Sequence, residues 1–566
     1  MLLGVDSRLI LEAPIFCAVQ FPSLGPAAAT QCPTRVVFDL RPPASPHAVG
    51  EAATLRIAER VAHEDGIIAR LVEADPAGIV IDRSASIEAR TDRTSAAMDQ
   101  GAPFITGGAL AAHDHRSGQP ILLLRAEFEH RWRYHPVTIG AHRLLSDAPE
   151  ESVRCSDLNL PLLADAAPLA DHRLLGGRRV SNGLRLAHLH RLLSSAGRAS
   201  NRAFGAMVGT EAALVWVDLA AAEDRRSLLD LYDTAFQSRL DAVRASATAG
   251  PPAPLRTREC SGCQWRDHCS PIIDRSRSTT IIQSINRSAH ARYRSLGIDT
   301  IDQLAATDPS TISDLRLDEM SWPRDRLVGH VDEARALVMK PNSALLRRGL
   351  VRLDVPAFDR EYDIDMESEV GGQAYLWGVY RASSDEATHD ACWDADPELA
   401  GARVFLAIWE RLNELRAAAA TAGDSIGFYC WHDRAERAAL QTGALAAARR
   451  LGFREAPALV EAFLDEVPLV DLCAIAQRDL VTGRSKGLKT IAPLAGFAWR
   501  DAEPSGEASM AWHAHAVDDR RSTDEQQWWR QRLIDYNEDD VRAEAAVREW
   551  MRRETFVSAD SLPPSS

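Results

Sequence analysis

The chain has 566 residues, and this length suggests about three or four domains. Hydrophobic residues make up 46% and charged residues 26%, as in ordinary globular proteins, and the formal net charge is −15. This acidic balance excludes a general basic surface and argues against non-specific electrostatic binding of nucleic acid as the main activity. It does not exclude a nuclease, because carboxylates that hold metal ions add negative charge.

No stretch of about 18 apolar residues occurs, so we expect no membrane-spanning helix. The first residues include Asp6 and Arg8 and lack the basic segment of a secretory signal. These features predict a cytoplasmic location. In that reducing compartment, the nine cysteines are expected to bind a metal or a cluster rather than to form disulfides.

Residues 1–277 are predicted to form a first α/β domain. Apolar residues at helical spacing predict helices over residues 50–72 and 225–245, and apolar runs predict strands over 121–125 and 213–219. A Gly-Pro-Pro-Ala-Pro segment at residues 250–254 then breaks the chain before a group of cysteines.

Residues 278–345 are predicted to form a small helical module, similar to a helix-hairpin-helix. Gly297 is expected in a turn, and Thr300 with Gln303 forms a possible capping box at the start of the next helix. At the other end of the chain, residues 557–566 contain two prolines and are predicted to be a disordered tail.

Residues 346–556 alternate between strand and helix patterns, which predicts a second α/β domain. The predicted elements are strands over 359–366, 375–380 and 425–431, and helices over 402–420 and from 435 to about 450.

Three cysteines, Cys260, Cys263 and Cys269, lie within ten residues and can close around one metal centre. A fourth ligand must come from elsewhere in the chain, and Cys32 is the best candidate. Four thiolates with one distant member favour an iron–sulfur cluster of the 4Fe-4S type. Zinc remains an alternative because His268 adjoins Cys269, although structural zinc more often uses two close pairs.

A distant cysteine followed by a three-cysteine group before a helical module resembles the RecB-type nucleases that carry an iron–sulfur cluster. The likeness covers about residues 1–340 and implies a PD-(D/E)XK nuclease fold whose two ends the cluster holds together. In that family a helical His, an Asp and an acidic-x-Lys motif form the site. His63 fits the first place, but Ile121 stands at the Asp place, and Thr138 and Gly140 stand where the acid and the Lys belong.

The resemblance therefore implies that this first domain keeps the fold and the cluster but has lost its chemistry. A shifted register, with Glu127 or Glu129 serving as the acid, is the alternative.

Carboxylates in the second domain follow a regular spacing. Asp365 and Glu367 lie two apart on a predicted strand and share a face, with Asp363 in line. Such a face is costly unless cations neutralise it. Tyr536 and Asp540 lie four apart and share one face of a predicted helix.

Two simpler explanations of these acids remain open. The strand could be a solvated edge strand, and residues 538–540 could be acids that favour a helix N-terminus.

These motifs resemble the DnaQ-like, DEDD-type exonucleases with an RNase H-like fold, over about residues 350–555. The stretches 375–380, 470–473, 487–492 and 536–543 carry the likeness together with the acids. It implies metal ligands at Asp365, Glu367, Glu436 and Asp540. The wider group usually has Asp at the second-motif place, so Asp433 competes with Glu436.

The same resemblance assigns further roles. Tyr536 would position the attacking water, Asp471 would orient a nearby loop, and Lys489 would either neutralise a phosphate or lie on the surface. The implied reaction is hydrolysis of a phosphodiester at a 3′ end with two magnesium or manganese ions.

The sequence thus predicts an α/β multidomain protein with a RecB-type domain, a helical module and an RNase H-like exonuclease domain. We expect nucleic acid as the partner, DNA more than RNA, with a role in DNA repair and no membrane association. The alternatives are a catalytically inactive nucleic-acid-binding scaffold, or a first domain that still cuts.

Overall fold

The computed structural model describes residues 22–48, 50–222, 226–319, 322–339, 344–501 and 505–561. The chain divides into two compact units, residues 1–43 with 60–252 and residues 44–59 with 253–566. The division falls in the Pro-rich segment at 250–254, so the second unit contains the cysteine segment and the helical module. No described helix is long and apolar enough to cross a membrane.

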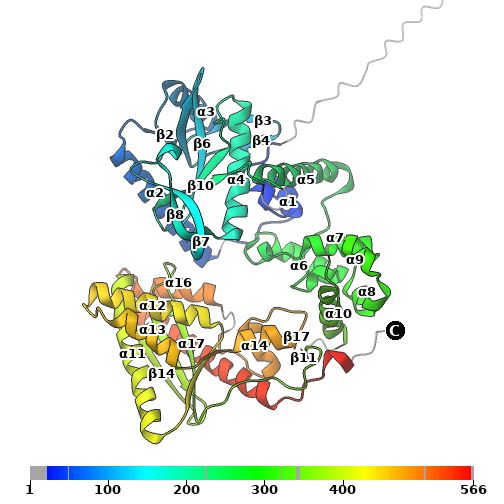
Figure 1. Ribbon diagram of the computed structural model, residues 1–566, viewed down its shortest axis with the longest axis vertical. Helices are drawn as coiled ribbons and strands as arrows, with labels where there is room; N and C mark the ends of the chain where they lie inside the picture. The colour runs from blue at the N-terminus through cyan, green and yellow to red at the C-terminus, as the bar shows by residue number, and fades with distance from the viewer. Residues whose placement is uncertain are drawn as a thin grey trace, which may run out of the picture. The chain divides into compact units, whose positions relative to one another are not determined.

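The first unit is built on a mixed eight-stranded sheet (Figure 1). Its strands, in spatial order, are β1 (Ile79–Val80), β2 (Phe104–Thr106), β5 (Leu122–Phe128), β6 (Trp132–Ile139), β9 (Phe204–Val208), β10 (Ala213–Asp218), β7 (Leu145–Asp157) and β8 (Ala167–Leu174). A small separate hairpin consists of β3 (Leu110–His113) and β4 (Arg116–Gly118).

Five helices accompany these strands. They are α1 (Pro33–Leu40), α2 (Glu51–Ala74), which runs across the division, α3 (Ile87–Gln100), α4 (Gly176–Ser195) and α5 (Leu228–Ala249). Ile67 and Leu71, four apart on α2, pack into one core with Leu122 and Val137 of the sheet. This contact is why the apolar spacing seen in the sequence produces a helix at this place.

The second unit begins with the cysteine segment and the helical module. Its helices are α6 (Arg266–Ser276), α7 (Arg287–Ser295), α8 (Ile301–Ala306), α9 (Asp314–Glu319) and α10 (Arg324–Met339). Gly297 has a positive φ of 79°, and Thr300 and Gln303 form the predicted capping box at the start of α8.

A five-stranded sheet forms the rest of the second unit. Its order is β14 (Glu386–Ala391), β13 (Ala374–Arg381), β12 (Arg360–Ser368), β15 (Ile426–Cys430) and β16 (Leu469–Asp471). The first three strands pair antiparallel, and β15 and β16 extend the sheet in parallel. A short antiparallel ribbon of β11 (Leu345–Leu346) and β17 (Leu480–Val481) stands apart from this sheet.

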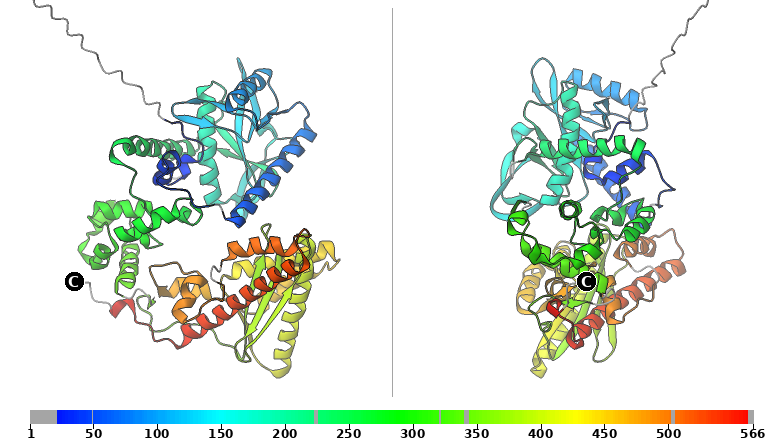
Figure 2. Two further views of the ribbon diagram at one scale, coloured as in Figure 1. Left: turned by 180° about the vertical axis from the view of Figure 1, so that it is seen from behind. Right: turned by 90° about the vertical axis from the view of Figure 1, so that its right-hand side faces the viewer.

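Helices cover both faces of the five-stranded sheet (Figure 2). On one face, α11 (Pro397–Ala422), α12 (Asp433–Arg450) and α13 (Ala456–Glu466) enclose the main core, which receives Tyr362 and Ile364 from β12. On the other face lies α17 (Thr523–Arg553), with α16 (Gly506–Val517) packed along it. Shorter helices α14 (Leu472–Asp479) and α15 (Leu488–Ile491) complete the unit.

The prediction of a disordered tail from residue 557 is wrong for residues 557–561. The Leu346 amide donates to the Val557 carbonyl at 2.9 Å, Ala559 is fully buried, and the Gly349 amide donates to Asp560 at 2.7 Å. These contacts order the segment although its composition is polar. Residues 562–566, with both prolines, lie outside the described residues.

The face of β12 that meets α17 carries charge. Asp363 is fully buried and receives two hydrogen bonds from the Arg548 guanidinium, at 2.8 and 3.1 Å. Burial raises the pKa of Asp363 to about 6, although the hydrogen bonds and charge of Arg548 oppose the shift. Next along the strand, Glu361 binds both Arg548 and Arg552.

Replacing Arg548 with Ala should destabilise the second unit strongly, because it leaves Asp363 buried without its cation. Breaking a buried pair in this way costs about 3–5 kcal/mol. Arg553→Ala is the matched control, since this arginine is 75% exposed and its pair with Glu549 should contribute about 0–1 kcal/mol. Thermal or urea unfolding measures both, and equal effects would contradict the importance of the Asp363–Arg548 pair.

Candidate metal centre

Strand β12 presents the predicted acids on one face. Asp365 and Glu367 point toward α17, whereas Ile364 and Met366 pack in the core on the opposite side. The strand lies between β13 and β15 and is therefore central, and Glu367 is only 7% exposed. The explanation as a solvated edge strand is thus excluded.

Helix α17 brings the third acid. Tyr536 and Asp540 lie well inside this helix, which starts at Thr523 behind a capping box of Ser522 and Glu525. The acids at 538–540 are therefore not the acids of a helix N-terminus. Both Tyr536 and Asp540 are buried on the side that faces the sheet.

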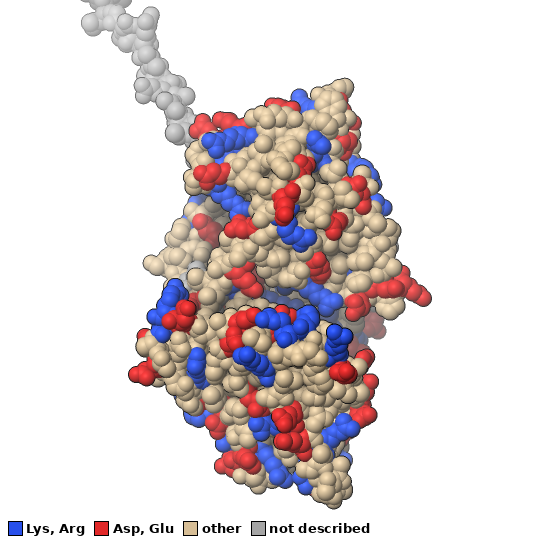
Figure 3. All heavy atoms as spheres, turned by 90° about the vertical axis from the view of Figure 1, so that its left-hand side faces the viewer, with Lys and Arg blue, Asp and Glu red and all other residues tan. Residues whose placement is uncertain are grey.

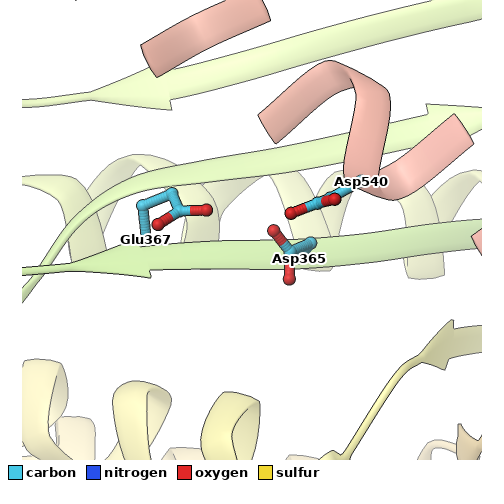
Figure 4. A group of neighbouring side chains, drawn as sticks. All are labelled: Asp365, Glu367 and Asp540. Atoms are coloured by element: carbon cyan, nitrogen blue, oxygen red, sulfur yellow. The ribbon is translucent and has the colours of Figure 1, made fainter. Parts of the chain in front are cut away.

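Asp365, Glu367 and Asp540 converge (Figure 4). Each offers one carboxylate oxygen, and these oxygens all lie within 4.8 Å of one another. Within the described ranges, this is the one group of three or more possible metal-ligating side chains that comes this close. An all-oxygen set of this kind suits magnesium or manganese.

Burial and mutual repulsion act on all three carboxyls. Burial and then the charge of Asp540 raise the pKa of Asp365 to about 8, and Lys489 offsets part of this rise. Burial and the charges of Asp365 and Asp540 raise the pKa of Glu367 well above its usual value. Burial also raises the pKa of Asp540, against the effect of Lys489. Divalent cations would relieve this repulsion, so the residues fit the metal pair that the sequence predicted.

Neutral and cationic donors hold the acids in place. Asn537 Nδ2 donates to Asp365 Oδ2 at 2.9 Å, and the Ser509 hydroxyl donates to Glu367 Oε2 at 2.6 Å. Trp499 Nε1 donates to Asp540 Oδ1 at 2.7 Å, and the Lys489 ammonium donates to the same oxygen. Lys489 is therefore part of the site and not a surface residue.

Lys489 also lies over two rings, 4.3 Å from the centre of Trp499 and 4.4 Å from that of Tyr536. The Tyr536 hydroxyl, which the sequence predicted to position water, hydrogen-bonds to Asp540, and burial raises its pKa. The hydroxyl is therefore protonated at neutral pH and able to donate.

Glu436 lies near the acidic group but outside the set within 4.8 Å. It is 3% exposed, one of its oxygens has no hydrogen-bond partner among the described residues, and burial and the charge of Asp365 raise its pKa to about 9. Asp433 instead pairs with Arg437 at 2.8 Å. Of the two second-motif candidates, Glu436 is therefore the one that interacts with Asp365, whose charge affects it more than that of any other residue.

The loop before Glu436 is held by acids as well. His432 has φ of 98°, a left-handed conformation that is strained for a residue with a Cβ. Its amide donates to Asp471 at 3.3 Å, and the adjacent Trp431 amide donates to Glu544 at 2.9 Å. Asp471 thus orients this loop, as expected, and it also caps α14 through the Ala474 amide.

Several residues of the site were not predicted from the sequence. Ser509 and Trp499 lie outside any motif, so no local signal marks them. Glu544 follows Asp540 by four residues, and that spacing could have revealed it. Gly378 lies opposite Asp365 on β13, and a Cβ there would come within 2.1 Å of Asn537 Oδ1. The missing side chain makes room for the Asn537–Asp365 hydrogen bond.

The first unit presents no comparable acid group among its described residues. Leu122 pairs with Val137, so Ile121 and Thr138, which the RecB-type resemblance aligned with acids, lie across from each other. The alternative acids are engaged elsewhere: Glu127 accepts from the Asn201 amide at 2.6 Å, and Glu129 accepts from Arg133 at 2.6 Å.

The predicted cluster ligands lie in short turns and at helix starts. Cys32 in the first unit precedes α1, and Cys260 in the second lies in a 3-10 turn, Arg258–Gly262, with Cys263 directly after it. The Thr257 amide donates to Cys260 Sγ at 3.3 Å, and Cys269 lies in α6.

Comparison with known protein families agrees with the C-terminal site. Residues 364–552, about a third of the chain, match the RNase H superfamily. The searches of curated proteins and of solved structures gave no match. The chain therefore contains an RNase H-like domain, which points to a nuclease that uses divalent metal ions on nucleic acid.

Without metal, the stability of the protein should fall as pH rises, in part because of Asp365. A carboxyl whose folded-state pKa is raised contributes fully below its usual value of 3.8, and that contribution is lost as pH rises through about 8. Each unit of difference is worth about 1.4 kcal/mol. In EDTA, Asp365→Asn should therefore raise the Tm at pH 8 by several degrees and flatten its decline between pH 5 and pH 8.

Glu461→Gln, at an exposed carboxylate of α13, is the control and should follow the unmodified protein. Adding manganese should raise the Tm of the unmodified protein more than that of Asp365→Asn. A Tm profile for Asp365→Asn that parallels the unmodified one would contradict this account of the buried acids.

Proposed function

We propose that the second unit is a two-metal-ion nuclease that removes nucleotides from the 3′ end of nucleic acid, DNA more than RNA. The observation that carries the proposal is the convergence of Asp365, Glu367 and Asp540 within an RNase H-like domain. The 3′ polarity rests on the resemblance to DEDD-type exonucleases.

Some residues of the site would hold the metal ions, and others would orient the attacking water and the phosphate. Asp365 would serve both metal ions, Glu367 and Asp540 one each, and Glu436 would complete the set. When bound, the ions supply an activated water and stabilise the leaving oxygen. Tyr536, whose hydroxyl bonds to Asp540, would orient that water, and Lys489 would face the phosphate.

Asp365→Ala and Asp540→Asn should reduce the release of mononucleotides from a labelled strand with manganese to background. Tyr536→Phe should lower kcat by about 100-fold or more, the usual size of a positioned proton donor. Glu436→Gln should lose activity, whereas Asp433→Asn should keep it, because the Asp433 carboxylate is paired with Arg437. Strands labelled at either end and strands blocked at the 3′ end establish polarity.

The outcomes separate three functions. Loss of activity in Asp365→Ala supports the C-terminal nuclease. Survival of activity in that variant would assign cutting to the first unit. No metal-dependent degradation of any DNA or RNA would leave an inactive nucleic-acid-binding scaffold as the function.

We also propose that residues 1–277 form a RecB-type domain that grips DNA, and that Cys32, Cys260, Cys263 and Cys269 hold a 4Fe-4S cluster in it. The close spacing of the last three and the amide donor to Cys260 Sγ support this ligand set. The helical module would contact the nucleic-acid backbone, and a place in DNA repair follows from the resemblance.

Anaerobically purified protein should be brown and contain about four iron and four sulfide per chain, as this cluster type requires. Cys260→Ser should lose both the colour and the iron. Cys155→Ser should retain them, since burial raises the pKa of Cys155 to about 11 and disfavours the thiolate. Zinc in place of iron would contradict the cluster and support the alternative metal.

A further inference from the structure

Helix α16 packs against α17 (Figures 1 and 2). The two helices carry Trp512, Trp528 and Trp529. Trp528 is 57% exposed, although an indole normally gains much by burial. It meets Trp529 edge to face, with ring centres 4.6 Å apart. An exposed indole held by a neighbouring ring offers a flat face to a ligand.

Arg532 links this exposed ring to the buried ones. Its guanidinium lies 5.5 Å from the centre of Trp528 and 3.9 Å from that of Trp512, and Asp501 anchors it at 2.8 Å. Trp512 in turn meets Tyr536 of the metal centre edge to face at 5.6 Å. Ring and cation contacts therefore run without a break from the exposed Trp528 to the metal centre.

The spacing along α17 explains the geometry. Trp528, Arg532, Tyr536 and Asp540 are four residues apart, and each such step turns the side chain by about 40°. The row starts exposed at Trp528 and ends buried at Asp540. Trp528 lies about 12 Å along the helix axis from Tyr536. A strand must therefore be longer than one nucleotide to reach from the metal centre to Trp528.

Other basic groups surround the same rings. Arg530 lies 5.9 Å from the centre of the Trp393 ring. The ring of His515 lies 4.7 Å from the centre of Trp529, but its two nitrogens are engaged by Arg521 and by Glu51. Elsewhere, the face in Figure 3 shows acidic and basic side chains interspersed. Aromatic faces combined with arginines are the features that bind single-stranded nucleic acid.

We propose that Trp528 and Arg532 bind an unpaired nucleic-acid strand on its way to the acids, by stacking of a base on the exposed indole. The inference rests on the proposed function and names its substrate class as single-stranded. A base must leave a duplex before it can stack on a side chain, so a fully paired strand does not use this surface. Arg530 and Arg532 would face the phosphates.

The test compares a 12-nucleotide strand with a chromogenic mononucleotide ester, which is too short to reach Trp528. Trp528→Ala should lower kcat/KM for the strand, relative to that for the ester, by about 5- to 100-fold, the usual effect of losing one stacked base. The change should appear in KM and not in kcat. Trp528→Phe should restore most of it, and Leu445→Ala, an exposed apolar residue on α12, should change neither substrate.

Binding separates this inference from the proposed function. In EDTA, a fluorescent 12-nucleotide strand should bind the unmodified protein more tightly than Trp528→Ala, and a blunt duplex should not distinguish them. If no nucleic acid is cut but this difference persists, the nuclease proposal fails and the strand-binding surface stands. Equal KM and equal binding in Trp528→Ala and the unmodified protein would overturn the inference.

Discussion

The C-terminal half depends on how strand β12 meets helix α17. Every second residue of β12 from Glu361 to Glu367 is an acid, so the acids are spaced about 6.6 Å apart along the strand. Every fourth residue of α17 faces this strand, and four residues rise about 6 Å along the helix, so the two spacings nearly match. At one end of this seam, Arg548 and Arg552 neutralise Glu361 and Asp363. At the other end lie Asp365, Glu367 and Asp540, and Lys489 forms an ion pair with Asp540. The same packing thus contributes stability at one end and leaves negative charge for cations at the other.

The first unit has the opposite character at the corresponding places. Ile121, just before β5, lies opposite Thr138 of β6, and neither side chain is a carboxylate. The acids that could have replaced them are engaged elsewhere. Glu127 accepts hydrogen bonds from Ser200 and Asn201, and Glu129 accepts one from Arg133. The absence of such an acid group among the described residues of the first unit agrees with the proposal that cutting belongs to the second unit.

Much of the second unit could be predicted because its signals are local. Alternation of acids with apolar residues identified β12, and spacing by four identified the buried face of α17. Sequence could not decide whether β12 was central or at an edge, because that depends on the pairing with β15, whose residues lie 66 positions further on. Ser509, Trp499 and the ordered segment at 557–561 were missed for the same reason, since each is fixed by a partner distant in sequence.

The metal centre also depends on the absence of a side chain at Gly378. The glycine carries no charge and binds nothing, yet a Cβ at this place would come within 2.1 Å of Asn537 Oδ1, so the Asn537 side chain would have to shift. Every acid would remain in the sequence, yet Asp365 would lose the hydrogen bond from Asn537 that orients it. In a related chain, the acidic motif alone is therefore an incomplete sign of activity, and the residue facing its first aspartate on the neighbouring strand must be read together with it.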